Sequence, residues 1–299
     1  MRALRLLAPI SALFLVAPLA ATEPSSTPVS FTTPDGFTIK GTLTIPATGP
    51  KRHPVVIFAP QFHQTRDSFA PLAERLNARG IATLALDLRG HGESTDKSGA
   101  AVAITDDFMA SAKAVGFDKI PSDLAQAAAW VRKHHGIDGR RVGLAGASVG
   151  AFSVLMASGK VRPQAVLALS PAGNEAFGGK ALDALKGSVT RGGGADLVFA
   201  AAGDKDAADN ATALATLPGV SVLTFEGSDH GSAFLKDHSE TMAVFFGEYL
   251  LYRQAFNRGT ATATDASKKG GVVTPAVLAG TPAAQGDQQP APPPPPSGN

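Results

Sequence analysis

The sequence predicts an α/β fold, in which helices cover both faces of a mainly parallel sheet. Two observations indicate this class. Short apolar runs rich in β-branched residues alternate along the chain with amphipathic stretches of helical period. The apolar runs are also unbroken, which is typical of strands buried on both faces. The chain has 299 residues, 44% of them hydrophobic, and no internal repeat, so we expect one large domain with a substantial core.

The predicted strands follow turn signals and apolar runs in chain order. The first two flank the turn Pro34-Asp35-Gly36, a sequence typical of a hairpin. The later strands are continuous apolar runs bounded by turns or by helical stretches. The ranges are 29–33, 37–45, 54–59, 81–88, 141–145, 165–169, 197–201 and 220–225.

The predicted helices lie between these strands and have apolar residues on one face. In the first, Phe69, Leu72 and Leu76 share a face, and Gly80 follows as a stop signal. A weaker pattern near 181–185 indicates a short helix, and a long apolar pattern closes the domain. The ranges are 67–79, 122–135, 148–157, 206–217 and 232–256, besides the weak one.

The two ends of the chain have compositions that differ from the rest. Residues 1–21 carry Arg2 and Arg5, then an apolar stretch and small residues, as in a cleaved secretory signal. That apolar stretch is shorter than a membrane-spanning helix needs, which favours cleavage over anchoring. We therefore expect a periplasmic or secreted protein without stable membrane insertion. The Pro- and Ala-rich segment 259–299 is expected to be disordered, which leaves 22–258 for the domain.

Composition and motifs exclude several classes of function. The net charge is +2, and without Arg2 and Arg5 the chain has 25 basic and 25 acidic residues, so no basic excess indicates a nucleic-acid partner. The absence of Cys excludes disulfides, thiolate metal sites and a cysteine nucleophile. No metal-ligand, Walker or dinucleotide-binding motif is present. We therefore expect no metal and no cofactor.

The segment Gly146-Ala147-Ser148-Val149-Gly150 is the strongest catalytic signal. It follows a predicted strand and opens a predicted helix, which is the context that a nucleophilic serine on this pattern requires. A sharp strand-to-helix turn strains the middle residue and crowds the positions two before and two after it, so these must be glycine. Ser148 is therefore the predicted nucleophile.

A serine nucleophile needs a base and a carboxylate that orients the base. His230 follows the strand 220–225, and Asp206 follows the strand 197–201, so both lie where parallel strands end. We predict His230 as the base and Asp206 as its orienting acid. Asp204 and Asp209 remain alternatives for that acid.

Two further segments resemble the α/β-hydrolase superfamily. Residues 67–76 resemble its first helix, and Asp-Leu-Arg-Gly-His-Gly-Glu-Ser at 87–94 resembles a specific loop of the family. The resemblance covers most of 28–258 and is closest to the lidless, dienelactone-hydrolase-like or carboxylesterase members. It implies the α/β-hydrolase sheet and the triad of Ser148, Asp206 and His230.

The resemblance also implies an oxyanion hole formed by the N–H groups of Phe62 and Val149. The chain departs from the family here, because Pro60-Gln61 stands where His-Gly is common and Pro60 has no N–H. Gln61 and His63 are candidate substrate contacts.

The segment 170–196 has no room for a full cap domain, whereas the loop 95–121 contains apolar residues and is expected to cover part of the cleft. We therefore predict a serine hydrolase that cleaves small or medium carboxylic esters, its partner being a small-molecule ester. A peptidase or amidase using the same triad, and a non-catalytic binding protein, are the alternatives. The oligomeric state is left open.

Overall fold

The structure is a computed structural model that describes residues 23–252. The predicted signal segment 1–21 and the predicted tail 259–299 therefore lie outside the described residues. The main strands are β1 (Ser25–Thr32), β2 (Thr38–Ile45), β3 (His53–Ala59), β4 (Ala82–Leu86), β7 (Ile137–Ala147), β8 (Ala165–Leu169), β9 (Ala195–Ala201) and β10 (Val220–Phe225).

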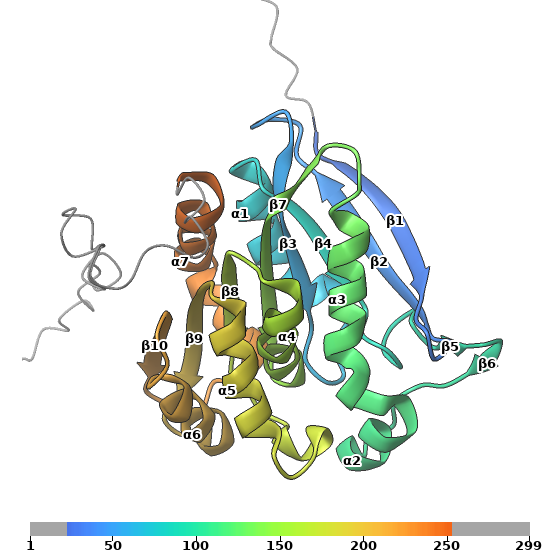
Figure 1. Ribbon diagram of the computed structural model, residues 1–299, viewed down its shortest axis with the longest axis vertical. Helices are drawn as coiled ribbons and strands as arrows, with labels where there is room; N and C mark the ends of the chain where they lie inside the picture. The colour runs from blue at the N-terminus through green and yellow to red at the C-terminus, as the bar shows by residue number, and fades with distance from the viewer. Residues whose placement is uncertain (1–22, 253–299) are drawn as a thin grey trace, which may run out of the picture.

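These strands form one eight-stranded sheet with the order β1-β2-β4-β3-β7-β8-β9-β10 (Figure 1). β1 and β2 form the expected antiparallel hairpin, and β2 is antiparallel to β4. From β4 to β10 all neighbouring strands are parallel. The prediction of a mainly parallel α/β sheet is thus confirmed, and parallel strands place the loops at their carboxyl ends along one edge.

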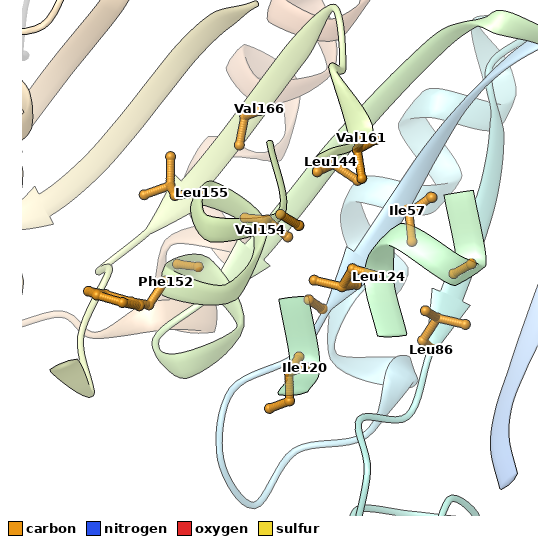
Figure 2. Close-up of a cluster of buried hydrophobic side chains, with 14 of the residues drawn as sticks. Ile57, Leu86, Ile120, Leu124, Leu144, Phe152, Val154, Leu155, Val161 and Val166 are labelled. Carbon is orange, nitrogen blue, oxygen red and sulfur yellow. The ribbon is translucent and has the colours of Figure 1, made fainter. Parts of the chain in front are cut away.

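Helices cover both faces of this sheet (Figure 1). Helices α3 (Ile120–Val131), α4 (Val149–Val161), α5 (Ala181–Gly192) and α6 (Lys205–Leu214) contribute to the core on one face, and α1 (Ala70–Ala78) and α7 (Leu235–Gly247) to the core on the other. Strand residues alternate between the two cores: Ile57 of β3 faces the first and its neighbour Phe58 the second. Figure 2 shows the first core, where Leu124 and Val154 of the helices meet Ile57 and Leu144 of the strands.

The predicted elements recur with shifted ends. β8 and β10 match their predicted ranges, while the weak helix near 181–185 extends to Gly192 as α5. The predicted closing helix 232–256 is instead a 3-10 turn (Gly231–Phe234), then α7, then a π turn (Glu248–Tyr252), beyond which the chain lies outside the described residues. Within residues 23–252, no helix is long and apolar enough to cross a membrane.

The loop 95–121 contains more structure than the sequence predicts. It holds the short strands β5 (Asp96–Lys97) and β6 (Ala100–Ala101) and then helix α2 (Phe108–Ser111), a π turn (Ala112–Gly116) and a 3-10 turn (Phe117–Lys119). These elements are too short to show a periodic sequence pattern, and they depend on interactions with residues that are distant in the sequence.

A buried arginine attaches this loop to the domain. The Arg89 side chain is 1% exposed, and its guanidinium donates to Val115 O at 3.1 Å. The same group donates to both carboxylate oxygens of Asp123, at 2.7 and 2.8 Å, and to Asp35 at 2.9 Å. Its hydrogen bonds hold the pKa of Asp35 well below the ordinary value. The cluster fixes the end of the loop 95–121 against the first hairpin.

Candidate active site

Ser148 occupies the sharp turn between β7 and α4. Its φ of 52° and ψ of −119° place a non-glycine residue in a strained conformation, as predicted for this motif. A Cβ atom on Gly146 would lie 2.3 Å from Gly150 O, and one on Gly150 would lie 2.1 Å from Ala59 O. Both glycines are therefore required by backbone contacts. The half-buried Ser148 is held where its side chain can reach the edge of the sheet.

The predicted oxyanion donors come from two segments that Gly150 brings together. The backbone of Ala59-Pro60, at the end of β3, packs directly against the α-carbon of Gly150, so Phe62 follows close to the serine turn. Val149 is the first residue of α4, and its N–H has no acceptor within the helix. In residues 23–252 no acceptor for the Phe62 N–H is found either. The roles of both N–H groups in holding an oxyanion stay predictions.

The imidazole of His230 is held by Asp204. His230 Nδ1 lies 2.7 Å from Asp204 Oδ2, and the Asp204 side chain is only 14% exposed. The prediction that Asp206 makes this contact is wrong, because Asp204 immediately precedes α6 whereas Asp206 lies exposed within its first turn. Asp209, the other alternative, pairs with Lys205 instead.

A close approach of two backbone loops explains why Asp204 is selected. Gly203 N donates to Gly227 O at 2.7 Å, and a Cβ atom on Gly203 would lie 2.6 Å from that same oxygen. The loop after β9 therefore touches the loop after β10, which places Asp204 opposite His230. Gly203 is the sequence signal that points to the adjacent aspartate, since a glycine there permits this contact.

The His230 loop also reaches the serine turn and the loop after β3. A Cβ atom on Gly231 would lie 3.5 Å from Ala147 Cβ, the residue before Ser148, and 2.1 Å from Gln61 Oε1. Gln61 Oε1 accepts a hydrogen bond from Ser232 N at 2.8 Å. Gln61, expected as a candidate substrate contact, thus uses its carbonyl oxygen within the protein.

Aromatic side chains form a wall beside the predicted oxyanion donors. The Phe62 ring packs edge-to-face on Phe108, with centroids 5.2 Å apart, and on Phe117 at 6.0 Å. A Cβ atom on Gly173 would lie 3.1 Å from Phe108 Cζ and 3.8 Å from Val149 Cβ. The loop 95–121 therefore reaches the site through Phe108 of α2, as the sequence leads us to expect.

Two histidines border this wall in different ways. His63 is exposed and packs on Phe62, with ring centroids 4.0 Å apart, and its Nε2 lies 4.0 Å from Asp106 Oδ1. His91 is buried, its Nδ1 lies 3.0 Å from Arg89 O, and desolvation lowers the pKa of its imidazole. Contact of His63 with substrate stays a prediction, and His91 contributes to packing behind Phe62.

Metal-binding side chains do not cluster in the described part of the chain: within 23–252 no group of three or more His, Asp or Glu residues could hold an ion.

Comparisons with known proteins agree with the fold. Residues 50–185 match the family model described as serine aminopeptidase, S33. No curated protein sequence matches the chain.

Solved structures of similar fold include several hydrolases. A dienelactone hydrolase from Anabaena variabilis is 22% identical with a TM-score of 0.58, covering 77% of this chain and all of its own. An acetyl xylan esterase from Paenibacillus sp. R4 is 20% identical with a TM-score of 0.60, covering 79% of this chain and 86% of its own. Est1E from Butyrivibrio proteoclasticus, solved with ferulic acid, is 19% identical with a TM-score of 0.55, and the match covers 72% of this chain and 96% of Est1E. These likenesses show that the chain has an α/β-hydrolase-like fold.

Proposed function

We propose that this protein is a serine hydrolase that cleaves carboxylic esters. The observation that carries the proposal is the 2.7 Å contact between His230 and Asp204 at the edge of the sheet where Ser148 sits on its strained turn. Nucleophilic acyl transfer requires a serine, an imidazole that takes its proton, and a carboxylate that orients the imidazole. The order Ser, acid, His along the chain is also that of the α/β-hydrolase motif.

In the proposed reaction, Ser148 Oγ attacks the ester carbonyl carbon while His230 takes the serine proton. Asp204 orients the imidazole and compensates the imidazolium charge. The N–H groups of Phe62 and Val149, with the amino-terminal end of α4, stabilise the negative charge on the carbonyl oxygen. His230 then gives its proton to the leaving alkoxide, so an alcohol departs and an acyl-enzyme forms. A water molecule, activated by His230, hydrolyses that intermediate to a carboxylic acid and free Ser148.

The substrate class is supported by what surrounds the site. Between β8 and β9 the chain forms only a 3-10 turn (Asn174–Phe177) and α5, which packs against α4 as part of the main fold, so this segment forms no separate cap domain over the serine. The aromatic wall of Phe62 and Phe108 limits the space beside Val149. We propose small or medium esters, a class that the names of two of the similar structures also suggest.

Peptide or amide cleavage is the second candidate, because the matching family model describes aminopeptidases. The same triad would serve that reaction. A non-catalytic binding protein on the same fold is the third, and it would have no use for the complete set of Ser148, His230 and Asp204.

Hydrolysis of p-nitrophenyl esters from acetate to palmitate tests the proposal, with Ser148→Ala as the matched variant. We expect release of p-nitrophenol from the short esters by the unaltered protein and its loss in Ser148→Ala. An aminoacyl p-nitroanilide, run in parallel, separates an esterase from an aminopeptidase. Absence of both ester hydrolysis and fluorophosphonate labelling of Ser148 would contradict the proposal and favour a binding protein. Much faster cleavage of palmitate than of acetate would contradict the proposed substrate size.

A further inference from the structure

Gln61 links two loops of the site that are far apart in sequence. It lies between Pro60 and Phe62, directly after β3, and its side-chain oxygen accepts a hydrogen bond from Ser232 N at 2.8 Å. Phe62 carries one predicted oxyanion donor, and Ser232 lies two residues after His230. One side chain thus connects the segment of the donor to the segment of the base.

The fit between Gln61 and the His230 loop is close. A Cβ atom on residue 231 would lie only 2.1 Å from Gln61 Oε1, so this approach requires the glycine that stands there. Gly231 has a φ of 57° and also lies against Ala147, next to the nucleophile. Gln61 therefore contacts the loop at the point where it passes the serine turn.

Other polar contacts hold the His230 imidazole and the backbone before it. Asp204 holds the imidazole itself, and Gly203 N holds the backbone at Gly227 O, before His230 in the chain. Gln61 holds the backbone after His230. Phe234, four residues after His230, is buried against Phe199 and Phe225, so Gln61 adds a polar contact to the apolar packing on this side of the loop.

We infer that Gln61 is a positioning residue, which sets the His230 loop relative to the serine turn and the Phe62 donor. The inference rests on the proposed function. Pro60 supplies no N–H, so this segment offers fewer backbone donors than a chain without proline there. The Gln61 carbonyl oxygen faces Ser232 and not the substrate, so its effect is exerted through His230. A displacement of about 1 Å at a catalytic group can cost roughly 100-fold in rate.

Three variants test this role. Gln61→Met keeps the length of the side chain and removes the acceptor, whereas Gln61→Glu keeps an oxygen that can accept from Ser232 N. Gln64→Met is the matched control, because Gln64 is exposed, lies in the same loop, and engages Gln61 only through its backbone N–H. If Gln61→Met is not recovered folded, Gln61→Ala replaces it, since the smaller side chain admits water to Ser232 N.

We measure kcat and KM for p-nitrophenyl acetate, with kcat normalised to the sites that a fluorophosphonate titrates, and Tm for each variant. We expect Gln61→Met to lose roughly 10- to 100-fold in kcat with little change in KM. Gln61→Glu should recover most of that loss, and Gln64→Met should match the unaltered protein. A merely structural role would lower Tm and the titrated fraction while leaving the normalised kcat unchanged, which would overturn the inference. A loss in Gln61→Glu as large as in Gln61→Met would also overturn it.

The imidazole NMR signals of His230 give a readout that does not require turnover. We expect them to shift in Gln61→Met and to stay in place in Gln64→Met, because only the first variant frees the loop. If the unaltered protein hydrolyses no ester and takes no label, the proposed function fails. The Gln61 contact is then judged by NMR alone, and unshifted His230 signals would refute it.

Discussion

Replacing Asp204 with Asn separates the acid that the structure selects from the one that the sequence favours. The Asp204 carboxylate lies 2.7 Å from His230 Nδ1, so it fixes the tautomer of the imidazole and offsets the charge that the ring gains when it takes the serine proton. An asparagine amide in the same place carries no charge, and its NH₂ group can face the ring and impose the opposite tautomer. The geometry stays similar while the electrostatic support is lost.

The size of the effect follows from the contact and its exposure. Two unit charges about 4 Å apart interact by ~4 kcal/mol at an effective dielectric constant of about 20. The Asp204 side chain is 14% exposed but that of His230 is 39% exposed, so solvent screening reduces this value. Because each ~1.4 kcal/mol of barrier is a tenfold change in rate, we expect kcat/KM to fall roughly 10²- to 10³-fold.

The assay is hydrolysis of p-nitrophenyl acetate by Asp204→Asn, with Asp206→Asn as its control. Both substitutions remove one carboxylate, two residues apart, but Asp206 is exposed within the first turn of α6 and should leave kcat/KM within about threefold of the unaltered protein. Circular dichroism checks that both variants are folded. A large loss in Asp206→Asn with little loss in Asp204→Asn would refute the assignment, and equal losses in both would refute the reasoning from the contact.

Two further predictions concern stability. A Cβ atom on Gly150 would lie 2.1 Å from Ala59 O, so Gly150→Ala should lower the free energy of unfolding by about 1–3 kcal/mol or more and abolish ester hydrolysis. Gly179→Ala is the control, because a Cβ atom there meets open space and should change neither property. Equal Tm values for the two variants would contradict this prediction. Burial raises the pKa of Asp196 from 3.8 to about 8 in the folded protein. Between pH 4 and 8 the unfolded chain has therefore lost a proton that the folded protein retains. The free energy of unfolding should then fall with rising pH by up to ~1.4 kcal/mol per pH unit. Asp196→Asn should remove this slope, stabilise the protein at pH 8 and change nothing at pH 4, as urea unfolding across that interval would show; an unchanged slope would contradict it.

Periodicity and turn residues predicted the sheet and most of its helices because these signals are local. β8 and β10 coincide with their predicted ranges, since each is an apolar run bounded by turns. The sharp turn at Ser148 was also predictable, because the crowding that demands Gly146 and Gly150 acts within five residues. The class of fold and the strained turn at Ser148 could therefore be read from the chain itself.

The acid was misassigned because its position depends on a contact between loops. Asp204 and Asp206 both follow β9, and nothing within the segment tells which of them faces the ring. The approach of Gly203 to Gly227 decides it, and these residues belong to different strand ends. The anchoring of the loop 95–121 by Arg89 was missed for the same reason, since Val115 and Asp35 lie far from it in sequence.

Pro60-Gln61, which departs from the family pattern, can be understood from its two neighbours in space. The Pro60 carbonyl lies against the α-carbon of Gly150, so proline, whose φ is fixed, stiffens the segment at the point where it touches the serine turn. Gln61, the next residue, accepts a hydrogen bond from the N–H of Ser232, which lies 171 residues later in the sequence. A glycine in its place would leave the Ser232 N–H without this side-chain acceptor and remove the polar link between the two loops. The departure therefore exchanges a flexible backbone for a rigid one with a side-chain link, directly before Phe62, the predicted oxyanion donor.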